Sequence, residues 1–241
     1  MKIRLLSDLH FEFYRNHALF NGPEADVLVI AGDLAVGAQA CAAALNCAAE
    51  HYPNVVYVQG NHECYERISL QDFDKQLRPL IKPNVHFLSP GYVKINDVIF
   101  IGACLWTNFR KDRVAKLVCA NKINDFRLIK GFDTDACAMQ HTKEIVFIKE
   151  AYEKLPGKKV IVTHFLPAVE CISEQYQGPD LINYYFANDY GDYISDLKDV
   201  PYWLFGHTHD NVNIAIGDVN LIANPYGYNK NPYYKEKVLD V

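Results

Sequence analysis

Five short apolar runs are each followed at once by a polar motif, and this alternation constrains the fold of the 241-residue chain more than any other feature. The runs are rich in Val, Ile and Leu, which is typical of buried strands. The motifs are Asp8-Leu9-His10, Ala31-Gly32-Asp33, Gly60-Asn61-His62-Glu63, Thr163-His164 and Gly206-His207-Thr208-His209. Because open α/β sheets form their ligand sites in the loops after strand ends, we expect these motifs to converge at one edge of a sheet.

The same pattern predicts strands that alternate with helices. Strands are expected at 3–6, 27–30, 55–58, 98–101, 160–163 and 203–205. Helices are expected at 38–50, 69–80 and 140–155, the last ending at Pro156-Gly157. Two more strands, 212–216 and 219–223, flank Gly217-Asp218 and predict a hairpin. This order predicts a layered α/β fold with a mixed sheet.

Two stretches interrupt the alternation, 107–135 and 167–192. Half of the residues are apolar, which suffices for one large core, and no linker composition divides the chain. We therefore expect a single domain over 1–241. Long irregular insertions in such a domain are often lids or binding loops, so both stretches are predicted to recognise a ligand. Ordinary surface loops are the alternative.

Composition limits the partners and the location of the chain. The formal net charge of −5, from 24 Lys and Arg against 29 Asp and Glu, argues against non-specific binding of nucleic acid. The N-terminal apolar run is too short for a signal peptide, and no window is long enough for a membrane span. Seven cysteines without a CxxC pair argue against a disulfide framework. These observations predict a cytoplasmic protein without membrane contact.

A single histidine after a strand is more often a hydrogen-bonded loop residue than a metal ligand, but the five motifs together favour a metal site. In an extended chain, residues two apart point to the same side, and two such pairs occur, Asp8 with His10 and His207 with His209. With Asp33, Asn61 and His164, these pairs offer seven imidazole, carboxylate and amide ligands. Seven ligands exceed the need of one tetrahedral ion and suit two divalent ions, which would attract an anion.

In this order, the motifs closely resemble the signature D-x-H, G-D, G-N-H-[DE], H and G-H-x-H of the calcineurin-like metallophosphoesterase superfamily. The resemblance extends from Asp8 to His209. It implies a four-layered αββα sandwich with two mixed β-sheets and a dinuclear metal centre at the C-terminal ends of the strands. After Asp33, the stretch Leu34-Ala35-Val36-Gly37 departs from the V-D-R-G continuation of the protein Ser/Thr phosphatases, which disfavours a phosphoprotein substrate.

The resemblance also implies a role for each motif residue. One metal ion would be held by Asp8, His10 and His209, and the second by Asn61, His164 and His207. Asp33 would bridge both ions. His62 corresponds to the family's non-ligand histidine beside the scissile phosphate, which is assigned to transition-state stabilisation or leaving-group protonation. Glu63 takes the place of the more usual Asp and is expected to orient His62.

Three further segments, 102–107, 123–127 and 224–228, resemble a bacterial and phage-type subgroup of small metallophosphoesterases. They suggest Asn124, Asp125 and Arg127 as substrate-binding residues, with helix capping and surface pairing as the alternative. Several aromatic side chains could stack on a base, although core packing is favoured for most of them: Trp106, Phe109, Phe126, Tyr184, Tyr185 and Tyr226.

The function implied by the resemblance is metal-dependent hydrolysis of a phosphodiester or nucleotide-like small substrate, through in-line attack by a metal-bridging hydroxide. A phosphomonoesterase of the same fold is the alternative. A catalytically silent protein-binding scaffold is disfavoured, because all seven ligands and His62 are retained. The ligand types alone suit Mn²⁺, Fe, Zn²⁺, Co²⁺ or Ni²⁺, and the resemblance favours Mn²⁺ for both sites.

Overall fold

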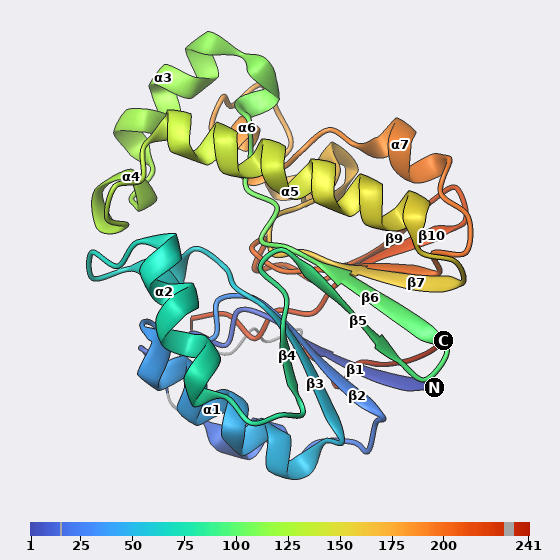
Figure 1. Cartoon of the computed structure of the whole chain (residues 1–241). Helices are drawn as coiled ribbons and strands as arrows, with labels where there is room; N and C mark the ends of the chain where they lie inside the picture. Colours follow the sequence, from blue (N-terminus) through green and yellow to red (C-terminus); the bar gives the residue numbers. More distant parts are fainter. Residues whose placement is uncertain (15, 229–233) are drawn as a thin grey trace.

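The computed structural model describes residues 1–14, 16–228 and 234–241. Two β-sheets pack face to face, and helices cover both outer faces (Figure 1). The expected four-layered αββα sandwich with two mixed sheets is therefore confirmed. Among the described residues, no helix combines the length and the apolar character that crossing a membrane requires.

The first sheet has five strands in the order β11-β1-β2-β3-β4. Their bounds are β1 Lys2–Leu6, β2 Val27–Ala31, β3 Asn54–Val58, β4 Val85–Phe87 and β11 Val238–Asp240. The strands β1 to β4 run parallel, and β11 pairs antiparallel with β1 at the edge. The C-terminal ends of β1, β2 and β3 therefore lie at one edge of the sandwich.

The second sheet has six strands in the order β5-β6-β7-β8-β10-β9. Their bounds are β5 Gly91–Ile95, β6 Val98–Gly102, β7 Lys158–Val162, β8 Tyr202–Phe205, β9 Val212–Ile216 and β10 Val219–Ala223. The four central strands are parallel, and the two outer strands are antiparallel to their neighbours. The predicted hairpin forms at β9 and β10, where Gly217 supplies a positive φ of 58°.

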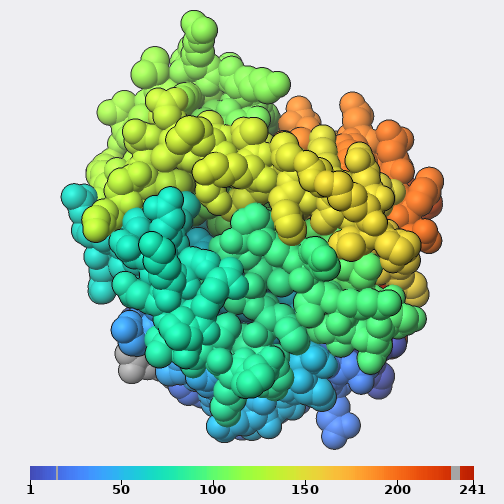
Figure 2. All heavy atoms as spheres, in the orientation of Figure 1, coloured from blue at the N-terminus to red at the C-terminus, as the bar shows by residue number. Residues whose placement is uncertain are grey.

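Two pairs of helices form the outer layers (Figure 1). The first sheet is covered by α1 Ala38–His51 and α2 Leu70–Leu77, and the second by α5 Thr134–Lys154 and α7 Gly191–Ser195. Helix α5 begins earlier than the predicted residue 140, because the Asp133 side chain caps it by accepting from the amides of Asp135 and Ala136. On the face seen in Figure 2, the side chains of α5 lie above those of α2.

The two interrupting stretches contain short helices. They are α3 Arg113–Lys122 and α4 Asp125–Leu128 in the first stretch, and α6 Asn183–Phe186 in the second, with 3₁₀ turns at Phe109–Lys111, Val169–Cys171 and Glu174–Tyr176. Figure 1 shows α3, α4 and α6 around the N-terminal half of α5, and α3 contacts α6. Both stretches therefore lie on the same side of the molecule, although most of α5 and all of β7 separate them in the sequence.

The core explains why the strands lack an alternating pattern. Leu5, Val29 and Phe100 point between the two sheets and are fully buried. Leu6 and Ile30, the next residues along their strands, point to the opposite face and are also fully buried, under the α1 layer. Strands buried on both faces are apolar throughout, which is why short continuous apolar runs predicted them.

Candidate active site

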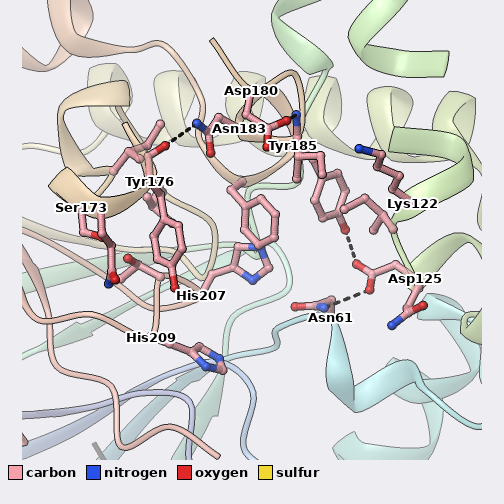
Figure 3. A pocket seen from close by; sticks show the side chains of 18 of the residues that line it. Asn61, Lys122, Asp125, Ser173, Tyr176, Asp180, Asn183, Tyr185, His207 and His209 are labelled. Carbon is pink, nitrogen blue, oxygen red and sulfur yellow. Dashed lines mark hydrogen bonds between the residues drawn. The ribbon is translucent and has the colours of Figure 1, made fainter. Parts of the chain in front are cut away.

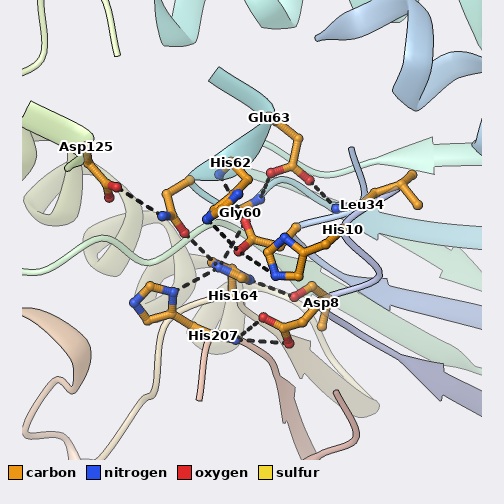
Figure 4. A network of polar contacts seen from close by, with 12 residues as sticks. Asp8, His10, Leu34, Gly60, His62, Glu63, Asp125, His164 and His207 are labelled. Atoms are coloured by element: carbon orange, nitrogen blue, oxygen red, sulfur yellow. Dashed lines mark hydrogen bonds and ion pairs between the residues drawn. The ribbon is translucent and has the colours of Figure 1, made fainter. Parts of the chain in front are cut away.

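The loops after β1, β2, β3, β7 and β8 meet at one edge of the sandwich (Figure 4). Main-chain contacts join the loops: the His10 amide donates to the Asp33 carbonyl at 3.0 Å, and the His207 amide donates to Asp8 Oδ1 at 2.9 Å. The His62 amide likewise donates to Asp33 Oδ1 at 3.0 Å. The expected convergence of the five polar motifs is what the structure shows.

The backbone of these motifs is turned, and this corrects the expectation that strand alternation aligns their side chains. Strand β1 ends at Leu6, and Asp8 and His10 follow it with φ values of 53° and 45°. His207 and His209 also have positive φ, 66° and 54°. Such left-handed residues cost roughly 1–2 kcal/mol each when they are not glycine. Strain of this kind clusters at functional sites, where surrounding contacts hold it.

The side chains form two groups that could each hold a metal ion and that share one carboxylate; they are called ligand groups below. The first ligand group is Asp8, His10, Asp33 and His209, whose ligand atoms all lie within 4.8 Å of one another. The second ligand group contains Asp33, His164 and His207 within the same limit, and Asn61, whose Oδ1 lies 3.1 Å from His164 Nε2. Asp33 thus stands between the groups, where the resemblance implies a bridging ligand.

The hydrogen bonds of the second ligand group accommodate a cation. His164 Nδ1 lies 2.9 Å from the Ala31 carbonyl oxygen and donates to it, so Nε2 is the ring nitrogen that faces the second ligand group. Nε2 lies 3.1 Å from Asn61 Oδ1, which is an acceptor. A proton on Nε2 fills this contact when no metal ion is bound, and a metal ion can take the place of that proton. In addition, His207 Nδ1 lies 3.2 Å from the same His164 Nε2, so three possible ligand atoms meet at this point.

The electrostatics of the site also favour cations. Burial by itself raises the pKa of Asp33, but His164 and His62 outweigh burial and hold that pKa well below its usual range. Burial by itself lowers the pKa of His164, but Asp33 and Asp8 raise it to about 10. The carboxylates therefore create a negative potential that a metal ion would satisfy. Imidazole, carboxylate and amide ligands without thiolate suit Mn²⁺, Fe, Co²⁺, Ni²⁺ or Zn²⁺.

Two glycines allow the loops to approach so closely. A Cβ atom on Gly60 would lie 2.1 Å from Asp33 Oδ1 and 2.8 Å from His164 Nε2. A Cβ on Gly206 would lie 2.6 Å from the Ala31 carbonyl oxygen and 2.8 Å from Asp8 Oδ2. Any larger residue would displace these ligands, so the Gly of the Gly-Asn-His and Gly-His motifs has a steric role.

Sequence reasoning missed Glu12, which joins the first ligand group to His62. Its Oε1 accepts from His10 Nδ1 at 3.1 Å and from His62 Nδ1 at 2.9 Å. Burial opposes ionisation, but the two histidines lower the pKa of Glu12 to about 2. Because both Nδ1 atoms donate to Glu12, the Nε2 atoms of both rings are directed into the site. The signal was present as a carboxylate two residues after His10.

Glu63 has a different role from the one expected. Its carboxylate accepts from the amides of Leu34 and Gly60, both at 2.9 Å, and from the Tyr57 hydroxyl at 2.7 Å (Figure 4). Burial raises the pKa of Glu63 to about 7. Glu63 therefore ties the loop after β2 to the loop after β3, and the orientation of the His62 ring falls to Glu12.

A cavity of about 1010 Å³ opens beside both ligand groups (Figure 3). Asp33, Asn61, His62, His207 and His209 line one side of it. The other walls come from both interrupting stretches, through Lys122, Ile123, Tyr176, Ile182 and Phe186 among others. The stretches that the sequence singled out thus stand over the ligand groups.

The three predicted substrate-binding residues occupy different places. Asn124 lines the cavity and is exposed. Asp125 also lines it, but its oxygens accept from Asn61 Nδ2 at 3.1 Å and from the hydroxyls of Tyr65 and Tyr185. The substrate-binding role predicted for Arg127 must be corrected. Arg127 is not among the residues that line the cavity, and its guanidinium donates to the Asn121 carbonyl. The alternative role, pairing on the surface, therefore applies to Arg127.

Most of the aromatic residues considered for base stacking belong to the core. Trp106, Phe109, Tyr185 and Tyr226 are buried. The rings that line the cavity are instead Tyr65, Tyr176, Tyr185, Phe186 and Tyr228, of which only Tyr185 was considered from the sequence. Core packing was therefore the correct interpretation for most of the aromatic candidates.

Comparison with known proteins agrees with this geometry. The protein from Acanthamoeba polyphaga mimivirus described as "Uncharacterized protein L509" is 27% identical over 205 residues, which are 76% of this chain and 72% of that protein. The phosphopantetheinyl hydrolase of Mycobacterium tuberculosis has the same fold, with a TM-score of 0.78 at 15% identity, over 99% of this chain and 95% of that one. TT1561 of Thermus thermophilus superposes with a TM-score of 0.62 at 11% identity, over 99% and 98%.

The family model of the calcineurin-like phosphoesterases matches residues 1–211, which include all seven predicted ligands and His62. The match covers both interrupting stretches as well as the five polar motifs. The chain therefore belongs to the calcineurin-like phosphoesterase family.

Proposed function

We propose that the protein is a dinuclear-metal-dependent hydrolase of phosphodiesters that carry an extended, largely uncharged substituent. One observation carries the proposal: two ligand groups share Asp33 and lie beside His62 at the base of a cavity of about 1010 Å³. When bound, two divalent cations polarise the phosphoryl oxygens and lower the pKa of a coordinated water, which supplies a nucleophile near neutral pH. We favour Mn²⁺ for both sites.

The residues of the chain would supply the metal ligands and a donor for the leaving oxygen. Asp8, His10 and His209 would hold one ion, Asn61, His164 and His207 the other, and Asp33 both. His62 is held by Glu12 through Nδ1 at 2.9 Å, so its Nε2 is directed toward the cavity. There it can donate a hydrogen bond or a proton to the leaving oxygen of the substrate, which typically contributes about 10²–10⁴-fold to the rate.

The walls of the cavity support a diester over a polyphosphate. Lys122 is the one lysine or arginine that lines the cavity among the described residues, and Asp180 also lines it. The two ions would balance the charge of the reacting phosphoryl group, but the walls offer only one lysine for the further phosphates of a nucleoside triphosphate. Ile123, Ile172, Ile182 and Phe186 offer an apolar surface instead. The stretches 107–135 and 167–192 thus act, in this proposal, as substrate-recognition segments of a single domain.

The name of one comparison protein supports this substrate class. The name of the Mycobacterium tuberculosis protein describes the hydrolysis of a phosphopantetheinyl group, a phosphate ester with a long arm. The second candidate function is a phosphomonoesterase, which the same ligand groups would serve equally well.

All seven cysteines are free thiols, which supports a reducing compartment such as the cytoplasm.

The test is hydrolysis of bis(p-nitrophenyl) phosphate and of p-nitrophenyl phosphate by the purified protein. We expect diester hydrolysis that a chelator abolishes and that Mn²⁺ restores, with Asp33→Asn inactive. A preference for the monoester would replace the proposal with the second candidate. Absence of both activities in protein shown to bind Mn²⁺ would contradict the hydrolase proposal.

A further inference from the structure

We propose that Tyr228 is an additional catalytic residue, which contacts the leaving oxygen of the substrate next to His62. The inference rests on the proposed function and concerns a residue outside the five polar motifs. The Tyr228 hydroxyl lies 3.3 Å from His62 Nε2, the ring nitrogen that faces the cavity. Tyr228 itself lines that cavity.

Ring packing fixes the position of this hydroxyl. The Tyr228 ring lies 4.3 Å from the His10 ring and 4.5 Å from the His209 ring, measured between centroids. Phe13 meets Tyr228 edge to face, with centroids 5.3 Å apart. The ring thus covers the first ligand group, while 42% of the residue remains exposed. Contacts with three rings direct the hydroxyl to the face where His62 lies.

Hydrogen-bond capacity leaves the Tyr228 hydroxyl free to bind one more oxygen. The Glu12 carboxylate occupies His62 Nδ1, so Nε2 is the nitrogen that meets both Tyr228 and the cavity. When His62 Nε2 carries the proton that it gives to the leaving oxygen, Nε2 donates to the Tyr228 hydroxyl oxygen, and the single O–H of the phenol is then free to donate to a second oxygen. A leaving oxygen bound near Nε2 would therefore be within reach of Tyr228 as well.

Tyr228 acts by hydrogen bonding and keeps its proton. In the hydrolysis, the P–O bond to the leaving group breaks, the bond to the oxygen of water forms, and His62 or solvent provides the proton for the leaving oxygen. A hydrogen bond from Tyr228 stabilises the charge that grows on that oxygen. This charge is large for a poor leaving group and small for a good one, so the benefit of Tyr228 depends on the leaving group.

The experiment compares methyl p-nitrophenyl phosphate with methyl phenyl phosphate, because the transferred group is the same and only the leaving phenol differs. Tyr228→Phe retains the ring and removes the hydroxyl. Tyr92→Phe is the matched control, because Tyr92 lies on β5 away from the site and is 53% exposed. The kcat of each protein is measured with Mn²⁺, and Mn²⁺ binding and thermal unfolding are measured in parallel.

We expect Tyr228→Phe to lose about 10-fold more kcat with the phenyl than with the nitrophenyl ester, the effect of one hydrogen bond worth about 1.4 kcal/mol. Mn²⁺ affinity should match that of the wild type, and Tyr92→Phe should retain the wild-type ratio. An equal loss on both esters, no loss on either, or weakened Mn²⁺ binding would overturn the role of Tyr228. Lack of diester hydrolysis by the wild-type protein would instead overturn the proposed function.

Discussion

The amide nitrogen of Asn61 lies 3.1 Å from Asp125 Oδ1, and this contact decides which end of the amide faces His164. An ionised carboxylate can only accept, so the NH₂ group must point to Asp125 and the amide oxygen to the second ligand group. Tyr65 and Tyr185 donate to the same carboxylate and hold it in place. Asp125 therefore positions Asn61, a proposed metal ligand, through hydrogen bonds.

Replacement of Asp125 by Ala should weaken binding of the metal ion at the second ligand group by about 10–100-fold, which is typical when the partner of a ligand is lost. Asp125→Asn should weaken it less, because an amide oxygen can still accept from Asn61. Titration calorimetry with Mn²⁺ measures both. Wild-type affinity in Asp125→Ala would show that Asn61 does not depend on Asp125.

Glu12 offers a second test, since one carboxylate oxygen holds both His10 and His62. Glu12→Ala should lower kcat by about 10–100-fold, because both rings can then turn or change tautomer. Glu12→Gln retains an oxygen acceptor and should lie between Glu12→Ala and the wild type. The kcat values of the wild type, Glu12→Gln and Glu12→Ala are compared with bis(p-nitrophenyl) phosphate as the substrate. Equal kcat values for all three proteins would refute the orienting role of Glu12.

Gly60 tests the close approach of the loops. Gly60→Ala places a methyl group where Asp33 Oδ1 lies only 2.1 Å away, so metal binding should be lost or strongly reduced. Gly91→Ala is the control, because the nearest atom to its added Cβ, Leu88 Cα, is at 3.5 Å, an ordinary contact. The Mn²⁺ content of Gly60→Ala and of Gly91→Ala is measured after dialysis against Mn²⁺. Full metal content in Gly60→Ala would contradict the packing of these loops.

The buried carboxyl group of Glu144, which is not among the predicted metal ligands, should make the stability of the fold depend on pH. It is buried and accepts from the Trp106 amide at 3.1 Å and from Gln140 Nε2 at 2.9 Å. Burial raises its pKa from 4.5 to about 7. The folded state therefore binds the proton more tightly, and stability falls as the pH rises from about 4.5 to about 7.

The loss across this window should reach about 3 kcal/mol for this one group. Other groups titrate as well, so the informative quantity is the difference between the wild type and Glu144→Gln, which cannot ionise. Urea unfolding with a chelator present, at about pH 5 and about pH 8, measures this difference. The wild type should lose more stability than Glu144→Gln on going to the higher pH, and parallel behaviour would argue against a buried neutral carboxyl group.

The sequence predicted the elements whose signal is local. The strands at 27–30 and 55–58 became β2 and β3, because residues buried on both faces form continuous apolar runs. Strands β4, β5 and β11 were missed. Strands β4 and β11 have only three residues each, and β5 is an edge strand that is largely unburied and lacks a continuous apolar run. The partner of β11 is β1, with Asp240 opposite Lys2 at the far end of the chain.

The candidate site likewise combines features with a local sequence signal and contacts between distant residues. Its candidate ligands were predicted because each motif follows a strand directly, whereas the contacts that orient these side chains join distant residues. Glu12 meets His62 across 50 positions, and Tyr228 meets His62 across 166. Glu63 is an instance of the opposite error: the resemblance implied that it orients His62, but its carboxylate accepts from the amides of Leu34 and Gly60. Only the folded chain specifies such partners.

The most direct test of the account is the number of metal ions that the chain binds. Metal analysis and Mn²⁺ titration of the wild type should give two ions per chain, because the two ligand groups share Asp33. Asp33→Asn should bind both ions more weakly, whereas His62→Ala should still bind two and lose kcat. One ion per chain, or an Asp33→Asn variant that still binds two with wild-type affinity, would contradict the dinuclear centre.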